Sequence, residues 1–227
     1  MGIARTAARG LVPLGLRVAP HFSSLFVREI LERSIDGGGP FRGAAAAADA
    51  RLRSADGDPV AAVSSVIDAH VRAAGAQGFV TNLGGLVTMA VTIPANVSGL
   101  ALLQCHLVAG IAHLHGYDLR DPRVRNAVLA CLLGETVVTE LVRSGKLPSS
   151  PMGLATSPVH DPELDTSIAQ DVTAELFSRV GGRRLATTVG RRVPLVGGGV
   201  GAIGDGVSTY RVGRYAEREL RPRPRTS

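Results

Sequence analysis

The residues whose spacing suggests chemistry lie near the C-terminus, in the stretch PLVGGGVGAIGDG at positions 194–206. Gly199, Gly201 and Gly204 spell G-x-G-x-x-G, the pattern of a loop that holds the pyrophosphate of a dinucleotide. Such a loop needs a strand before it, a helix after it, and an acidic residue about 20 positions further on, after a second strand. Only 23 arginine-rich residues follow Gly204, and none of them resembles a strand. The sequence therefore argues against a dinucleotide site.

The same glycines have a second interpretation at helical spacing. Gly197 and Gly201 are four residues apart, as are Gly204 and Ser208. Small residues at this spacing let two helix backbones approach closely, in membranes especially. Because a glycine inside a helix costs ~1 kcal/mol relative to alanine, so many glycines predict close packing or membrane insertion. A flexible glycine loop is the alternative.

The histidines offer a candidate metal site. His106 and His113 are seven residues apart and would share a helix face, and His70 could complete the set. No H-E-x-x-H or C-x-x-C pattern is present, and Cys105 and Cys131 lie within apolar helical patterns. We therefore expect structural histidines, no metal and no cofactor. No nucleophile–base pair is evident, so we expect no catalytic residues and a protein that is not an enzyme.

Three Asp-Pro pairs mark the helices that must position these residues. An Asp N-cap followed by Pro at the first helical position begins a helix, and the pairs predict helices over 59–74, 122–144 and 162–180. No run of residues alternates convincingly as a strand would. We predict an all-α fold, a single helical bundle.

A long uncharged segment lies in the middle of the chain. Residues 73–117, 45 in all, contain no Asp, Glu, Lys or Arg. Pro94 divides this segment into a predicted helical hairpin of residues 79–93 and 95–115. Each half is near or below the ~20 residues that a membrane span needs, and polar residues dilute both. The segment is therefore either the centre of a soluble bundle or a shallow, re-entrant membrane insertion.

These patterns define two sets of candidate residues. The predicted packing or membrane-facing positions are Gly84, Gly85, Pro94, Gly197, Gly201 and Gly204. The polar residues expected to be buried, and so to need hydrogen-bond partners, are Asn82, Asn96, Gln104, Asp118 and Asp205. Structural networks between helices are the simpler interpretation of the second set, and contact with a ligand or lipid headgroup is the other.

The charge is concentrated at the two ends of the chain. Residues 1–28 hold four Arg and no acid, residues 181–227 hold ten Arg and three acids, and the middle is net negative. A C-terminal helix would place Arg211, Arg214, Arg218 and Arg221 on one face. Such a face suits an anionic membrane surface. Few aromatic residues accompany these arginines, which argues against nucleic acid; a solvated basic tail is the alternative.

Several spaced motifs together resemble the EcsC family of bacterial proteins. The stretches that carry the resemblance are Glu32–Gly37, Gly75–Gly85 (GAQGFVTNLGG), Ile93–Asn96, Ile111–Asp118 (IAHLHGYD) and Arg192–Gly201 (RVPLVGGGVG). The resemblance predicts a basic segment over 1–29, a helical domain over 30–216 and a basic tail over 217–227. It implies a helical, membrane-associated protein linked to an ABC transporter or to secretion, and it supplies no catalytic residues.

We therefore predict a non-enzymatic protein that contacts or shallowly enters the bilayer through its glycine-rich helices. Its expected partners are anionic membrane lipid and a membrane protein such as an ABC transporter, and its expected location is the cytoplasmic side of the cell membrane. The alternative is a soluble helical bundle that binds a lipid or another apolar ligand.

Overall fold

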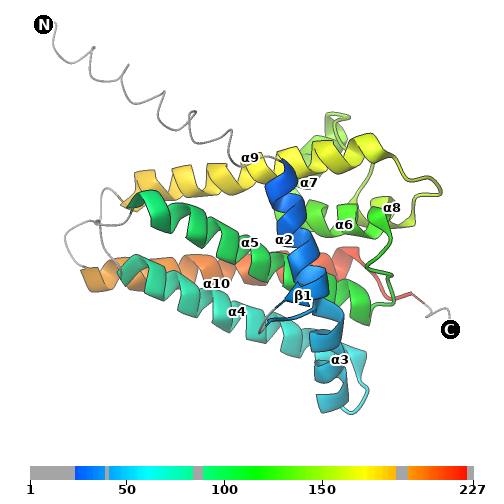
Figure 1. Ribbon diagram of the computed structural model, residues 1–227, viewed down its shortest axis with the longest axis horizontal. Helices are drawn as coiled ribbons and strands as arrows, with labels where there is room; N and C mark the ends of the chain where they lie inside the picture. The colour runs from blue at the N-terminus through cyan, green and yellow to red at the C-terminus, as the bar shows by residue number, and fades with distance from the viewer. Residues whose placement is uncertain (1–23, 39–40, 84–88, 188–193, 224–227) are drawn as a thin grey trace, which may run out of the picture.

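The computed structural model describes residues 24–38, 41–83, 89–187 and 194–223, and within them the predicted all-α fold is confirmed (Figure 1). Two strands of two residues each, β1 (Gly37–Gly38) and β2 (Phe41–Arg42), pair antiparallel. The helices are α2 (Ser24–Asp36), α3 (Ala44–Ser54), α4 (Pro59–Leu83), α5 (Met89–Leu114), α6 (Pro122–Leu133), α7 (Glu135–Arg143), α8 (Pro151–Thr156), α9 (Pro162–Thr187) and α10 (Pro194–Glu219).

The three Asp-Pro pairs begin helices as predicted. Each aspartate accepts a hydrogen bond at 2.9 Å from the backbone N–H two residues later, which satisfies one of the free donors at the start of a helix. The N–H groups belong to Val60 in α4, Arg123 in α6 and Glu163 in α9. α4 and α9 are longer than predicted and end at Leu83 and Thr187.

The single helix predicted over 122–144 is wrong, because Gly134 breaks it into α6 and α7. Gly134 has φ +83° and ψ 161°, a conformation that is essentially restricted to glycine. The division of the uncharged segment at Pro94 is also wrong. α5 begins at Met89 and continues through Pro94, so the chain does not change direction at that residue.

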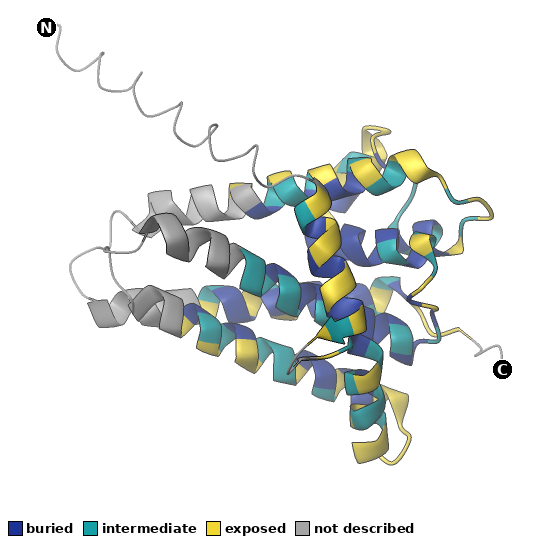
Figure 2. Cartoon of the chain, viewed as in Figure 1, coloured by how far each residue is buried: buried dark blue, intermediate teal, exposed yellow. Residues whose placement is uncertain are grey.

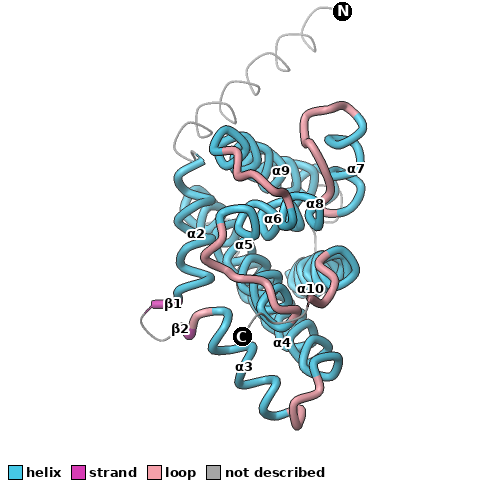
Figure 3. Tube along the Cα trace, turned by 90° about the vertical axis from the view of Figure 1, so that its right-hand side faces the viewer, coloured by secondary structure: helices cyan, strands magenta, loops and turns pink. Residues whose placement is uncertain are grey.

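The core is built around α5. α6 and α9 lie on one side of this helix, and α4 and α3 lie on the other (Figure 3). Leu107, Val108 and Ile111 of α5 are completely buried. Removing a side chain of this size from water contributes about 1.5–3 kcal/mol. Figure 2 shows the resulting band of buried residues along α5, α6 and α10.

α10 packs along α4, and small residues allow the close approach. Gly206 lies against Val71 of α4. A Cβ added to Gly213 would meet Ile67 of α4 at 3.1 Å and Leu107 of α5 at 3.2 Å. Both neighbours are core residues, so glycine is required for this contact between three helices.

The helical structure continues beyond residue 216, although the sequence analysis begins a basic tail at residue 217. α10 extends to Glu219, and Leu220 is completely buried. The Arg223 N–H donates to the carbonyl of His115 at 2.8 Å, and the Tyr117 hydroxyl donates to the carbonyl of Arg221 at 3.0 Å. These bonds attach residues 221–223 to the turn that follows α5.

None of the helices in the described ranges combines the length and the apolar character needed to cross a membrane.

Candidate functional site

An open cleft of about 970 Å³ lies on the side of α10 that faces α7 and α9. The lining residues come from the α6–α7 junction (Leu133, Gly134, Glu135, Thr136 and Val137), from α9 (Glu175) and from α10 (Ile203, Gly204, Val207, Ser208, Tyr210, Arg211, Val212, Arg214, Tyr215 and Arg218). The positive φ of Gly134 turns the chain at the cleft edge, so the break between α6 and α7 helps to shape the cleft. The volume falls within the ~300–1,000 Å³ of small-molecule sites.

Exposed apolar side chains of α10 form one stripe in the cleft. Ile203, Val207 and Tyr210 are 68%, 43% and 49% exposed. Their spacing of four and three residues places them on one helix face. The spacing was present in the sequence, but our prediction followed the glycines and missed this stripe.

The four arginines predicted on one helix face are all exposed. Arg211, Arg214 and Arg218 lie on α10 and line the cleft, whereas Arg221 follows the last residue of that helix, Glu219, so the predicted face holds three arginines and not four. Arg214 pairs with Glu217 at 2.6 Å, and Arg218 pairs with Glu135 at 2.7 Å. Arg211 forms no ion pair with any other residue that the structure describes. Exposed ion pairs contribute only ~0–1 kcal/mol, so an anionic ligand can compete for all three cleft arginines. Arg221 lies outside the cleft lining.

Two of the polar residues predicted to be buried are buried, Gln104 on α5 and Asp205 on α10. Gln104 is completely buried, and its Nε2 donates to the hydroxyls of Ser208 at 3.3 Å and Thr209 at 3.4 Å. Its Oε1 has no hydrogen-bond partner among the described residues. Asp205 is 1% exposed on α10. Because Ser208 also lines the cleft, Gln104 supports the cleft wall from behind.

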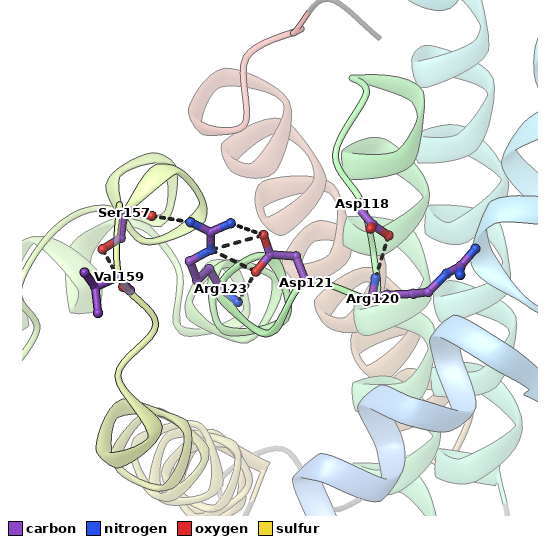
Figure 4. Close-up of polar contacts among 6 residues, drawn as sticks. All are labelled: Asp118, Arg120, Asp121, Arg123, Ser157 and Val159. Carbon is purple, nitrogen blue, oxygen red and sulfur yellow. Dashed lines mark hydrogen bonds and ion pairs between the residues drawn. The ribbon is translucent and has the colours of Figure 1, made fainter. Parts of the chain in front are cut away.

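The predicted burial of Asp118 is wrong. Asp118 is exposed in the turn after α5, where its Oδ1 accepts the N–H of Arg120 at 2.9 Å (Figure 4). An ionised carboxylate is best placed in water when its only described partner is a backbone N–H. The uncharged run therefore ends at the molecular surface.

Figure 4 also shows the network at the start of α6. The Arg123 guanidinium donates to both carboxylate oxygens of Asp121, with Nη2 to Oδ2 at 2.6 Å, and to the carbonyl of Ser157. These bonds hold the pKa of Asp121 below its usual value. Because Ser157 follows α8, this network fastens the segment between α8 and α9 and has a structural role.

The remaining predicted positions contribute less to the site. Gly84 and Gly85 lie outside the described residues. Asn82 in α4, Pro94 and Asn96 in α5, and Gly197 and Gly201 in α10 are helical, but the surroundings of their side chains also lie outside what the structure describes. Gly204 lines the cleft. The G-x-G-x-x-G pattern therefore lies inside a helix, where the geometry of a dinucleotide loop does not exist.

The three histidines of the candidate metal site form two separate contacts. His113 bonds to Asp49 of α3 at 2.8 Å, whereas His106 faces His70 of α4 at 2.9 Å. In the described part of the chain, no three His, Cys, Asp or Glu residues are grouped as metal ligands would be. The cysteines are fully buried, and burial raises the pKa of both thiols, that of Cys105 to about 12.

The fold and the cleft define a helical bundle with an amphipathic groove along its last helix. The sequence model of the EcsC protein family matches residues 49–224, most of the chain, and the chain belongs to this family. The match begins after the stretch 32–37 that we included in the resemblance. Searches of curated proteins and of solved structures found no significant match.

Proposed function

We propose that this EcsC protein associates with membranes through one end of its bundle. The observation that carries the proposal is the arrangement of the uncharged segments. In Figure 1, α4 and α9 end, and α5 and α10 begin, at the same end of the molecule. Three of these helices reach that end with no Asp, Glu, Lys or Arg, over residues 73–83 in α4, 89–114 in α5 and 194–204 in α10. A surface that interacts only with water rarely lacks charge over three adjacent helix ends.

α9 and two exposed apolar side chains at the same end also support the proposal. α9 carries Arg183 and Arg184 in its last turn. Phe79 of α4 and Ile203 of α10 are exposed apolar residues toward the same end. Exposed apolar side chains at this end suit the interface of a bilayer, and basic residues close to them in the sequence would each add roughly 1 kcal/mol at an anionic one.

A shallow contact fits better than a crossing. The uncharged ends of α4 and α10 are shorter than the ~20 residues of a spanning helix. α5 is long enough, but no described helix, α5 included, combines that length with the apolar character needed to cross a membrane. Polar residues such as Asn82 and Asn96 would need partners deeper in hydrocarbon, whereas at the headgroup level they stay hydrated. We therefore place the protein at the membrane surface, inserted to the depth of the acyl boundary.

Vesicle flotation tests this proposal. The full chain is expected to float with vesicles that contain phosphatidylglycerol and to lose flotation when Phe79 and Ile203 are both changed to Asp. Val60→Asp is the matched control, because Val60 is an exposed apolar residue near the opposite end of α4. Equal loss in both variants, or no flotation of the unchanged protein at low salt, would refute the proposal.

The cleft supports a second candidate function, the binding of an anionic amphiphile. Its apolar stripe would hold an acyl chain, and Arg211 would pair with the headgroup. Native mass spectrometry with oleate as the probe is expected to show one bound molecule, weakened by Arg211→Gln and unchanged by Arg221→Gln. Equal binding in both variants would remove this candidate.

The absence of enzymatic activity, the location on the cytoplasmic side and an ABC transporter as partner stay predictions. Crosslinking in cells followed by identification of the bound membrane proteins would test the last of these.

A further inference from the structure

His70 of α4 and His106 of α5 face each other through one nitrogen each. The Nε2 of His70 lies 2.9 Å from the Nδ1 of His106, and the ring centroids are 5.1 Å apart. Each outer nitrogen faces a backbone carbonyl. His70 Nδ1 lies 2.7 Å from the oxygen of Val66, and His106 Nε2 lies 3.0 Å from the oxygen of Arg42 in β2. Three polar contacts therefore form a chain that joins α4, α5 and the β-hairpin.

Counting protons shows what this chain requires. A carbonyl oxygen only accepts, so both outer nitrogens must carry a proton to form their bonds. A neutral imidazole has one proton, so two neutral rings would have none left for the contact between them. Two bare nitrogens would then face each other at hydrogen-bond distance. One additional proton completes all three bonds and gives the pair a single positive charge.

A second additional proton would break the arrangement. It would point two N–H groups at each other, and the surroundings oppose it as well. Burial lowers the pKa of His70 to about 4, with the charge of His106 and of Arg51 acting in the same direction. Burial also lowers the pKa of His106, and for both rings it outweighs the hydrogen bonds to the Val66 and Arg42 carbonyls, which raise the pKa. Burial therefore opposes the first proton as well as the second, and the three hydrogen bonds must hold the first proton against it. On α3, Arg51 is bonded to Ser65 of α4, and the carboxylate of Asp49 pairs with His113.

We propose that His70 and His106 form a proton-binding site, in which one shared proton fastens β2 to α4 and α5. The two rings titrate as a pair, with one proton held across the neutral range and a second taken up only in acid. The connection weakens when the pair gains or loses a proton. This proposal is independent of the membrane-associated function, so either can fail without the other.

The sign of a pH dependence tests the proposal. In His106→Asn, the amide can donate an N–H to His70 Nε2 without bringing a charge. If the folded pair holds one proton, the stability advantage of the unchanged protein over this variant falls about tenfold in the folding constant from pH 5.5 to 7.5. The reason is that the unfolded His106, with a pKa near 6.5, loses its proton over this range while the folded pair keeps its own. If both folded rings are neutral, the advantage rises about tenfold instead, which would overturn the proposal.

His113→Asn is the matched control, because His113 lies on the same helix but pairs with a carboxylate. Urea unfolding at each pH gives the folding constants. His113→Asn is compared with the double variant His113→Asn/His106→Asn, which lacks the His70–His106 pair. The tenfold fall in the stability advantage is expected to remain in this comparison. If the stability advantage no longer falls with pH when His113 is replaced, the fall does not come from the His70–His106 pair.

Nitrogen-15 NMR of the full chain tests the shared proton without any substitution. We expect scalar coupling between His70 Nε2 and His106 Nδ1 across one N–H···N bond at pH 6.5. Two uncoupled, unprotonated inner nitrogens would refute the proposal. Chemical shifts of the inner nitrogens that change when Zn²⁺ is added and return with a chelator would also refute the proposal. Histidines that bind a metal also donate their outer N–H to carbonyls, so this result would make the pair a metal site.

Discussion

Gly213 allows a direct test of the packing between α10, α4 and α5. In Gly213→Ala, the new methyl group would lie 3.1 Å from Cγ1 of Ile67 and 3.2 Å from Cδ2 of Leu107. These neighbours are nearly or completely buried, so they can move only by disturbing the core. Overpacking of this kind costs about 1–3 kcal/mol.

Gly206 is the matched control on the same helix. A methyl group at this position would lie 3.7 Å from the carbonyl oxygen of Val71 and 3.8 Å from its Cγ1, which are ordinary contacts. Replacing a helical glycine with alanine gains ~1 kcal/mol in propensity at either site. Gly206→Ala is therefore expected to stabilise the protein by roughly this amount. Gly213→Ala is expected to be about 1–3 kcal/mol less stable than Gly206→Ala, because the propensity term cancels between them.

Urea unfolding followed by circular dichroism measures this difference. In a chain of this length it corresponds to a gap of roughly 2–4 °C in Tm for each kcal/mol. If Gly213→Ala is as stable as Gly206→Ala, the three helices do not meet at Gly213 as described.

Three further predictions follow from local geometry. Asp121→Ala is expected to cost about 1 kcal/mol of unfolding free energy at pH 7. Because Arg123 holds the pKa of Asp121 low in the folded protein, this contribution is present above pH ~4. It is lost as the pH falls through the pKa of the folded state. Chemical denaturation at pH 7 and pH 3 measures it, and Asp161→Ala, which removes an exposed cap without such a pair, should show less acid dependence. Neither Cys105 nor Cys131 is expected to react with a thiol reagent at pH 8 until the protein unfolds, because both are buried with raised pKa values; rapid labelling of the folded protein would contradict their burial. Gly134→Ala is expected to cost about 1–3 kcal/mol in thermal unfolding, because its φ and ψ strain any residue with a Cβ; a neutral effect would show that the junction of α6 and α7 relaxes.

The helices were predictable wherever local chemistry determines them. The Asp-Pro pairs specify helix starts through a cap and a fixed φ, and neither depends on distant residues. The break at Gly134 was missed because an isolated glycine inside a helical pattern is tolerated and does not by itself mark the end of a helix. The sequence was also misleading at Pro94, where α5 accommodates a proline six positions into the helix.

The candidate site was less predictable, because it depends on which face of α10 is covered. The sequence drew attention to Gly197, Gly201 and Gly204, whereas the described contacts with α4 and α5 involve Gly206 and Gly213. The surroundings of Gly197 and Gly201 lie outside what the structure describes, so their part in the packing stays a prediction. The bond between His70 and His106 joins residues 36 positions apart, so no local pattern in the sequence reveals it.

A polarity-sensitive fluorophore can detect whether the uncharged end of the bundle contacts the membrane. Because the native cysteines are buried, a single introduced cysteine can be labelled selectively in the folded protein. A label at Ile203→Cys is expected to shift to the blue when phosphatidylglycerol vesicles are added, and a label at Val60→Cys, near the other end of the bundle, is expected to remain unchanged. An unchanged spectrum at position 203, or equal shifts at both positions, would contradict the account.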